Sequence, residues 1–263
     1  MSVPVGAPDV AGSGDAVTLE RVTMDTRPDL TAYDGVLFDL DGVLTPTAEV
    51  HMHAWRTMFT DLFRDWDISP QYSDRDYFEH LDGKKRYDGV AALLRSRDVE
   101  IPWGEPGDPV TADTVCGIGN RKNVVFEEVL RADGIAAYPG SLALVQKLQD
   151  AGVPIAVVSS SKNAREVLTV AGIIDRFPVI MDGVVAEQEG LASKPAPDVF
   201  ARAAEMLGVD PARSAAVEDA HSGVQSAVAA GYGLVVGVDR GAGAATLTAV
   251  GAHVVVDDLS ELV

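Results

Sequence analysis

Two carboxylates, Asp39 and Asp41, follow a short apolar run and are separated by a single leucine. The apolar residues predict a buried strand, and the two-residue period of a strand puts both carboxylates on the same side of its end. Acids held this close repel each other unless a hard cation or a shared proton lies between them. In that setting one carboxylate can attack a phosphorus atom while the other transfers a proton.

The Asp-x-Asp-Gly pattern also fits two other structures. EF-hand calcium loops begin in the same way, but they close with a Glu at the twelfth position, where this chain has Val50. A strand that ends in a polar Asp-Gly turn is the second alternative. Taken alone the motif favours such a turn, so the chemical interpretation depends on partners elsewhere in the chain.

Three later groups of polar residues could supply those partners. They are the hydroxyl-rich segment 159–163, Lys194 in the proline-rich segment 194–198, and the pair Glu218 and Asp219. Each is expected at a strand end or a helix start, where an open α/β sheet collects its ligand groups. Hydroxyls and backbone N–H groups at a helix start suit a phosphate, and a lysine adds a compact positive charge. Two further carboxylates would complete an oxygen-rich magnesium site.

In this order, the four groups resemble the signature motifs of the haloacid dehalogenase (HAD) superfamily of phosphoryl-transfer enzymes, from about Tyr33 to the C-terminus. Within it the chain is most similar to the β-phosphoglucomutases, through segments 47–51, 161–163, 193–198 and 218–219. The resemblance implies a mutase that interconverts β-D-glucose 1-phosphate and glucose 6-phosphate. It also implies an aspartyl-phosphate, a bisphosphate intermediate, Mg²⁺ as cofactor and a phosphorylated sugar as partner.

The resemblance assigns the chemistry to four residues. Asp39 is the expected nucleophile and Asp41 the general acid/base, whose backbone carbonyl also touches magnesium; a turn residue is the alternative for Asp41. Lys194 would neutralise charge on the transferring phosphoryl group, and Ser159 would donate a hydrogen bond to its oxygens. The expected metal ligands are Asp39, Asp41, Glu218 and Asp219, with Asp219 bound directly. Acids in the first turn of a helix are the alternative for the last pair.

A second set of residues is expected to bind the substrate. Arg86 would clamp the distal phosphate by a bidentate bond, and His51 would steady Asp41 as a cap closes. Ordinary helix N-capping is the alternative for Ser161 and Asn163. The full expected set is Thr47, His51, Gly83, Arg86, Lys122, Ser160, Ser161, Lys162 and Asn163. The other histidines are expected to be structural.

Three positions depart from the mutase pattern. Pro46 stands where the mutases often have an acid, and it could change how a cap swings. Asp82 precedes Gly83 where the matching motif carries a lysine, and this charge reversal leaves the sugar open. Ser160 replaces an alanine. A phosphatase of the same superfamily is therefore the first alternative, and a catalytically inactive binding module is the second.

Composition narrows the classes of partner. A formal charge of −19 disfavours nucleic acids and anionic membrane surfaces as partners. A local cluster of cations and N–H groups can still bind a small phosphate ester. No stretch has the pattern of a membrane span or a signal peptide, and the single cysteine, Cys116, excludes an internal disulfide. We expect a cytoplasmic monomer or weak dimer.

Periodicity predicts an α/β fold with a doubly wound parallel sheet, a Rossmann-like HAD core, and an inserted all-helical cap domain. Residues 1–30 form the expected flexible extension, residues 31–47 and 134–263 the core, and residues 48–133 the cap. Strands are expected at residues 35–40, 153–158, 179–181, 214–217, 234–238 and 253–256. Helices are expected at residues 55–63, 87–94, 115–130, 141–150, 164–171, 197–207 and 223–230, and a turn-rich loop at residues 101–109.

Overall fold

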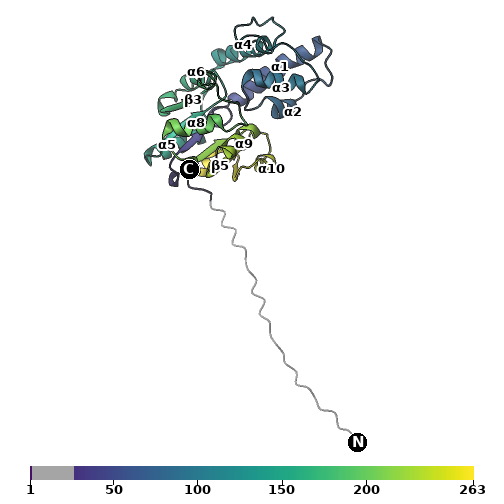
Figure 1. Cartoon of the computed structure of the whole chain (residues 1–263). Coiled ribbons are helices and arrows are strands. Elements are labelled where there is room, and N and C mark those ends of the chain that lie inside the picture. Colours follow the sequence, from purple (N-terminus) through teal and green to yellow (C-terminus); the bar gives the residue numbers. More distant parts are fainter. Residues whose placement is uncertain (2–26) are drawn as a thin grey trace.

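The computed structural model describes Met1 and residues 27–263, apart from the side chains of residues 129, 131 and 133. Two layers make up the described part of the chain (Figure 1). The first is an α/β core, a parallel sheet with helices on both faces. The second is a group of helices between the first and second strands. No helix among the described residues has both the length and the apolar composition needed to cross a bilayer.

The six strands lie where the sequence predicted them, and all of them run parallel. Their order is β3-β2-β1-β4-β5-β6, so the first strand of the chain lies between β2 and β4 at the switch point where such sheets bind ligands. The bounds are β1 Val36–Phe38, β2 Ile155–Val158, β3 Val179–Met181, β4 Ala215–Glu218, β5 Leu234–Val238 and β6 Val254–Val256. The first strand is shorter than expected because residues 40–45 turn back on themselves.

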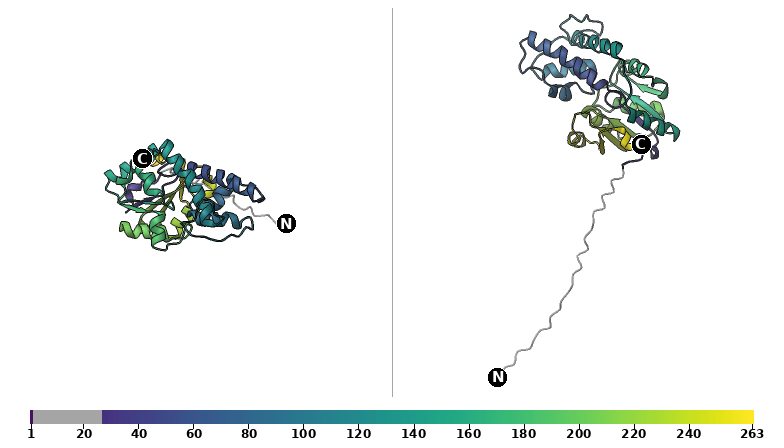
Figure 2. Two further views of the ribbon diagram at one scale, coloured as in Figure 1. Left: turned by 90° about the horizontal axis from the view of Figure 1, so that it is seen from above. Right: turned by 180° about the vertical axis from the view of Figure 1, so that it is seen from behind.

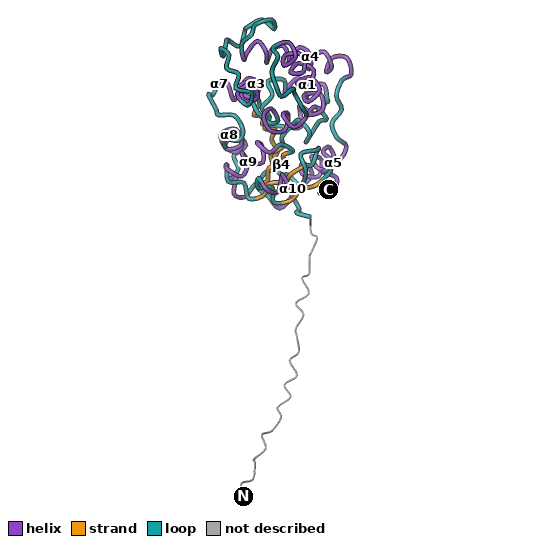
Figure 3. Tube along the Cα trace, turned by 90° about the vertical axis from the view of Figure 1, so that its right-hand side faces the viewer, coloured by secondary structure: helices purple, strands orange, loops and turns teal. Residues whose placement is uncertain are grey.

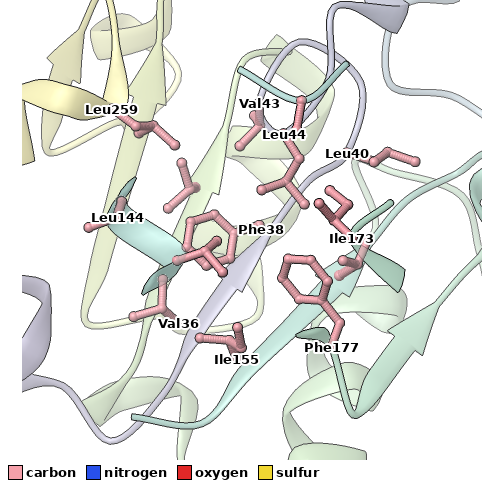
Figure 4. Packing of buried hydrophobic residues seen from close by; sticks show 14 of the residues in the cluster. Val36, Phe38, Leu40, Val43, Leu44, Leu144, Ile155, Ile173, Phe177 and Leu259 are labelled. Atoms are coloured by element: carbon pink, nitrogen blue, oxygen red, sulfur yellow. The ribbon is translucent and has the colours of Figure 1, made fainter. Parts of the chain in front are cut away.

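The alternation of side chains along β1 divides the core in two. Val36 and Phe38 point to the face covered by α5 (Pro139–Asp150) and α6 (Ala164–Val170). Figure 4 shows the packing on this face, to which α5 contributes Leu144. Leu37 points to the opposite face, which is covered by helices α8 (Asp198–Leu207), α9 (His221–Ala229) and α10 (Ala244–Ala249). Burial on both faces explains why the strands are continuous apolar runs.

The second layer is a helical cap. Its elements are α1 (Thr47–Asp65), α2 (Asp74–Asp76) with the π-helical turn Tyr77–Leu81, α3 (Arg86–Arg95) and α4 (Val115–Asp133). Residues from Trp55 to Ile118 form an apolar cluster of their own, whereas Phe126 and Leu130 at the far end of α4 pack with the core. Figures 2 and 3 show the cap helices grouped together beyond one end of the strands. This is the carboxyl end, because the cap loop bonds Ser160 and Ser222, which follow β2 and β4. The short helices at residues 74–81, α7 (Gly183–Gln188) and α10 were not predicted.

The described residues before β1 pack against the core. Leu30 begins a 3₁₀ turn (Leu30–Ala32) and is fully buried. Arg27 forms an ion pair with Glu261 in the last turn of the chain. Leu30 and Arg27, which belong to the expected extension of residues 1–30, therefore contact the core, while residues 2–26 lie outside the described part.

Truncation of Leu30 tests this contact with the core. Leu30→Ala removes a buried side chain from the core, so the free energy of unfolding should fall by about 2–5 kcal/mol. Met206→Ala, on the exposed face of α8, should change it by less than about 0.5 kcal/mol. Urea unfolding followed by circular dichroism measures both, and an unchanged Leu30→Ala midpoint would place this segment outside the cooperative unit.

Candidate functional site

The loop after β1 is a tight turn that presents the two expected catalytic carboxylates. The N–H groups of Leu44 and Thr45 both donate to the Leu40 carbonyl, at 2.9 and 3.0 Å. Gly42 has a φ of +81°, and a Cβ there would lie 1.9 Å from Asp219 Oδ2. Only glycine allows the loop to approach the second acid so closely.

Lys194 is buried directly beneath this loop, with 1% of its surface exposed. Its ammonium donates to Asp39 Oδ1 at 2.7 Å, to Glu218 Oε1 at 2.5 Å and to the Val158 carbonyl at 3.1 Å. All three protons therefore have acceptors. Burial opposes the charge, but the two carboxylates outweigh it and raise the pKa of Lys194, so the lysine is a fixed cation beside Asp39.

Glu218, the last residue of β4, and Asp219, the next residue, lie close to Asp39. Glu218 Oε2 accepts the N–H groups of Asp219 and Ala220, at 3.1 and 3.3 Å, and a Cβ at Gly223 would lie 1.9 Å from Glu218 Oε1. One carboxylate oxygen from each of Asp39, Glu218 and Asp219 lies within 4.8 Å of the others. Three of the four expected metal ligands are thus brought together by their side chains.

Negative charge accumulates in this cluster. Burial first, with neighbouring carboxylates adding to it, raises the pKa of Asp39 and of Asp219 well above the usual range. Asp82 comes from the cap, and burial together with the Glu218 charge raises its pKa to about 7. Closely spaced carboxylate oxygens that resist ionisation are the donor set a hard divalent cation stabilises. The residues therefore fit Mg²⁺.

The Asp41 side chain turns away from this cluster. It accepts a hydrogen bond from Thr47 Oγ1. Thr47 Oγ1 also forms a hydrogen bond with Thr45 Oγ1, at 2.9 Å. His51 Nε2 lies 3.4 Å from Asp41 Oδ1. Burial opposes ionisation of Asp41, but His51 and Thr47 outweigh it and lower its pKa. Asp41 as a metal ligand through its backbone carbonyl stays a prediction.

Lys122 approaches Asp41 through His51. Its side chain is 2% exposed, contacts His51 Nδ1, and places its nitrogen 5.1 and 4.9 Å from the ring centres of Trp55 and Phe126. Burial, followed by the charge of Arg86, lowers the pKa of Lys122 well below the usual range. His51 and Lys122, two cap residues that were predicted to bind the substrate, therefore contact each other next to Asp41.

A second polar cluster joins α3 and α4 to the loop after β2. Arg86 Nη2 donates to Asn123 Oδ1 at 2.6 Å, and Asn163 Nδ2 donates to the same oxygen at 2.8 Å. Lys162 is paired with both oxygens of Glu187, each at 2.7 Å. Sequence reasoning missed Asn123 and Glu187, although Asn123 follows the predicted Lys122 directly.

The serines after β2 shape the loop rather than cap a helix. Ser161 N–H donates to Ser159 Oγ at 3.0 Å, and Asn163 N–H donates to Ser161 Oγ at 3.1 Å. Helix α6 begins at the next residue, and the Asn163 side chain makes no capping bond. The capping alternative for Asn163 is therefore wrong. Ser159 is 2% exposed, and its catalytic role stays a prediction.

Core hydroxyls hold the loop between the π-helical turn and α3. Ser160 Oγ donates to the Gly83 carbonyl at 2.7 Å, and Ser222 Oγ donates to the Asp82 carbonyl at 2.9 Å. Gly83 has a φ of +68°, and a Cβ there would lie 2.4 Å from Ser222 Oγ. Ser160, which departs from the mutase pattern, is therefore a direct link between core and cap.

The same loop is held at its other end. Lys85 N–H donates to Ser193 Oγ at 2.9 Å, and Lys85 Nζ contacts the Leu191 carbonyl. We call residues 82–85 and their three serine partners the serine latch. Its bonds all involve the backbone of the cap loop, so they fix the position of the cap whatever side chains that loop carries.

A partly open cavity of about 370 Å³ lies between cap and core. Ten of the expected site residues line it, including Asp39 and Asp41, the two aspartates predicted to be catalytic, together with Asp219 and Arg86. The remaining five lie behind the lining: Thr47, Ser159, Asn163, Lys194 and Glu218. The structure therefore separates residues that face a ligand from those that hold them in place.

The expected structural role of His253 is confirmed outside the cavity. The single cysteine, Cys116, is fully buried on α4. His253 Nδ1 accepts the N–H of Val235 at 2.8 Å, which joins the start of β6 to β5.

A helical cap over paired aspartates at the switch point of a parallel sheet defines a class of capped α/β enzymes. Residues 33–231 match the haloacid dehalogenase-like hydrolase family. The chain belongs to this family, and within it to the β-phosphoglucomutase-like subfamily.

Similar proteins support the assignment. A protein of Mycobacterium bovis named β-phosphoglucomutase is 48% identical over 236 residues, covering 86% of this chain and 90% of the relative. The β-phosphoglucomutase of Bacillus subtilis is 34% identical and covers 78% and 83%. The solved β-phosphoglucomutase of Clostridium difficile superposes with a TM-score of 0.71 at 26% identity, covering 88% and 93%. CbbY of Rhodobacter sphaeroides, solved with xylulose-(1,5)bisphosphate, gives 0.67 at 26% identity, covering 88% and 96%.

The raised pKa of Asp82 predicts a pH-dependent cost of folding. At about pH 3 the carboxyl group is largely protonated in both states, but between about pH 4 and 7 it ionises mainly in the unfolded chain, so stability falls as pH rises. Without metal, Asp82→Asn should be more stable than the wild type by about 1–3 kcal/mol at pH 8 and equal at about pH 3. Urea unfolding in EDTA at both pH values measures this difference.

An exposed acid of the cap provides the control for that measurement. Asp113→Asn, whose side chain is 67% exposed, should shift stability by less than about 0.5 kcal/mol at either pH. Equal stability of wild type and Asp82→Asn at pH 8 would contradict the electrostatic account.

The serine latch can be tested without an activity assay. A Ser160→Ala/Ser222→Ala variant loses two hydrogen bonds worth about 0.5–1.5 kcal/mol each, so the Lys85 amide should exchange with deuterium about tenfold faster or more. Ser226→Ala, which removes a comparable 2.6 Å bond to the Ala196 carbonyl inside the core, should leave Lys85 exchange unchanged. Native-state hydrogen exchange measures all three proteins, and unaltered protection in the double variant would show that the serines do not hold the cap.

Proposed function

We propose that the protein is a magnesium-dependent phosphosugar mutase that interconverts β-D-glucose 1-phosphate and glucose 6-phosphate. The observation that carries this proposal is that residues of two separate polar clusters, Asp39 of one and Arg86 of the other, line the same cavity. The acid cluster around Asp39 suits the reacting phosphoryl group, and Arg86 with its asparagine partner suits a second phosphate. A mutase needs both sites because its intermediate is a bisphosphate.

The metal would be held by Asp39 and Asp219, with the Asp41 backbone carbonyl as a third oxygen. Glu218 already accepts three hydrogen bonds, from Lys194 and two N–H groups, so its contribution is to fix Lys194 and the acid loop. When bound, Mg²⁺ supplies positive charge to the oxygens of the transferring group.

Asp39 acts as the nucleophile in the first half of the cycle. Its free carboxylate oxygen attacks phosphorus and the bond from phosphorus to the donor oxygen breaks, which leaves an aspartyl-phosphate. Lys194 holds the other carboxylate oxygen and offsets the charge on the phosphoryl group. Asp41, which is ionised in the free enzyme, takes up a proton before this step and gives it to the leaving oxygen, and His51 with Thr47 fixes its orientation.

The second half reverses these roles with a different oxygen of the sugar. Phospho-Asp39 transfers its phosphoryl group to the free hydroxyl of the hexose phosphate while Asp41 takes the hydroxyl proton, and a bisphosphate forms. The bisphosphate turns over, Arg86 holds the newly made ester, and the original ester returns its phosphoryl group to Asp39. Positioning and charge neutralisation account for most of the acceleration in such transfers.

The serine latch would serve the mutase chemistry by holding the cap loop against the core beside Asp39. Water competes with the sugar hydroxyl for phospho-Asp39, and exclusion of water protects the intermediate. The latch places Asp82 and Gly83 against the core, so it would limit the access of water to the reacting group.

A sugar phosphatase is the second candidate, and two observations favour it. Asp82 brings a carboxylate where the mutase pattern has a lysine, and Glu187 already neutralises Lys162. Both features weaken attraction for a second phosphate. The chemistry up to the aspartyl-phosphate is the same, and water then replaces the sugar hydroxyl.

One assay separates the candidates. With Mg²⁺, β-glucose 1-phosphate and a trace of bisphosphate, the mutase proposal expects glucose 6-phosphate with little free phosphate. Asp39→Asn should reduce this activity to background because an amide cannot attack phosphorus, whereas Asp113→Asn should retain it. EDTA should abolish the activity and Mg²⁺ restore it. Stoichiometric phosphate release would favour the phosphatase, and turnover by Asp39→Asn would refute the assigned nucleophile.

A further inference from the structure

One aromatic side chain of the cavity is held half exposed. Trp103 belongs to the loop between α3 and α4, lines the same cavity as Asp39, and has 49% of its surface exposed. Burial of an indole is favourable, and the nearby Ile101 does pack against the apolar cluster of the cap. Stability of the cap alone therefore does not account for the position of Trp103.

The backbone of this loop is fixed to the first turns of α4. Cys116 N–H donates to the Trp103 carbonyl and Val115 N–H to the Pro102 carbonyl, both at 3.0 Å. Asn120 Nδ2 donates to the Pro106 carbonyl, also at 3.0 Å. An aromatic ring carried on such an anchored backbone is preorganised for a ligand, so little conformational freedom is lost on binding.

The other large aromatic side chains of the cavity already have partners. Trp55 lies under the Lys122 ammonium and stacks on Phe59, with ring centres 5.6 Å apart. Tyr87 lies under the Lys162 ammonium at 5.5 Å. Trp103 makes no ring or cation contact with any described residue.

The place of Trp103 follows from the course of α4. Lys122 lies at the acid/base end of the cavity, and Cys116, which binds the Trp103 backbone, precedes it by six residues, or about 9 Å along the helix. Pro106, three residues further along the same loop, also lines the cavity, and so does the ion pair of Lys162 and Glu187. The partly exposed part of the lining thus combines apolar side chains with charged hydrogen-bonding groups.

We propose that Trp103 and Pro106 form a sugar-binding wall that determines substrate specificity. A pyranose ring has an apolar C–H face and a polar rim of hydroxyls, so the indole would cover the face while the Lys162–Glu187 pair binds hydroxyls. This inference rests on the proposed function and names its substrate class: phosphates of cyclic sugars, in preference to acyclic phosphoesters.

The sugar-binding wall can be tested by comparing the kinetics of Trp103 variants on a cyclic sugar phosphate and on an acyclic phosphoryl donor. With β-glucose 1-phosphate, Trp103→Ala should lower kcat/KM about tenfold or more, and Trp103→Phe should restore most of it. With acetyl phosphate, an acyclic phosphoryl donor, both variants should react with Asp39 at the wild-type rate. Val110→Ala, an exposed apolar side chain of the same loop outside the cavity lining, should match the wild type on both substrates.

Tryptophan fluorescence gives an independent readout. Glucose 6-phosphate should change the emission of the wild type, and most of that change should be absent in Trp103→Phe, whereas inorganic phosphate should leave the Trp103 signal unaltered. The fluorescence result tests the wall even if no mutase activity is found. Full mutase efficiency in Trp103→Ala, or equal signals from wild type and Trp103→Phe, would overturn the inference.

Discussion

A single buried ammonium group organises the site. Lys194 comes from the loop after β3 and α7, and its nitrogen binds acceptors at the ends of β1, β2 and β4. These three strands are neighbours in the sheet. A buried charge of this kind is tolerated only when its partners are complete, because removal of one partner leaves an uncompensated ion in a low-dielectric interior. The geometry of Asp39 and Glu218 is therefore tied to the arrangement of the sheet.

One ammonium cannot balance the carboxylates around it. Asp39, Glu218 and Asp219 come from the core, and Asp82 adds a fourth acid when the cap loop lies against the core. The raised pKa values of Asp39, Asp82 and Asp219 express this excess. A divalent cation would relieve the repulsion, so metal occupancy and the position of the cap are coupled through the same charges.

Much of this arrangement could be predicted from sequence, because it depends on local order along the chain. Asp39 and Asp219 directly follow apolar strands, and parallel strands bring their carboxyl ends to one edge, so these two acids could be placed together from their motifs. Lys194 could be added because its motif lies just before a helix start, where such sheets also collect ligand groups. Contacts between cap and core could not be predicted. Asn123, Glu187 and Ser222 carry no motif, and the bonds of Ser160 and Ser193 to residues 82–85 are not part of theirs, so these roles arise only when separate segments meet. Helices α7 and α10 were missed because short runs of Val, Ala and Thr have no clear helical period.

A mutase and a phosphatase of this family would share the same aspartyl-phosphate on Asp39. They would differ in the residues around it that select the acceptor, a sugar hydroxyl or water. Asp39, Asp41 and Lys194 would make the same aspartyl-phosphate in either enzyme, so the core does not discriminate between them. On the proposed function the acceptor would be selected by the cap, which brings Arg86, Asp82 and Trp103 to the cavity and is held against three core serines. Trp103 would favour a sugar over water, whereas Asp82 would weaken attraction for a second phosphate. In that proposal specificity depends on the segment inserted after β1, while reactivity depends on the sheet.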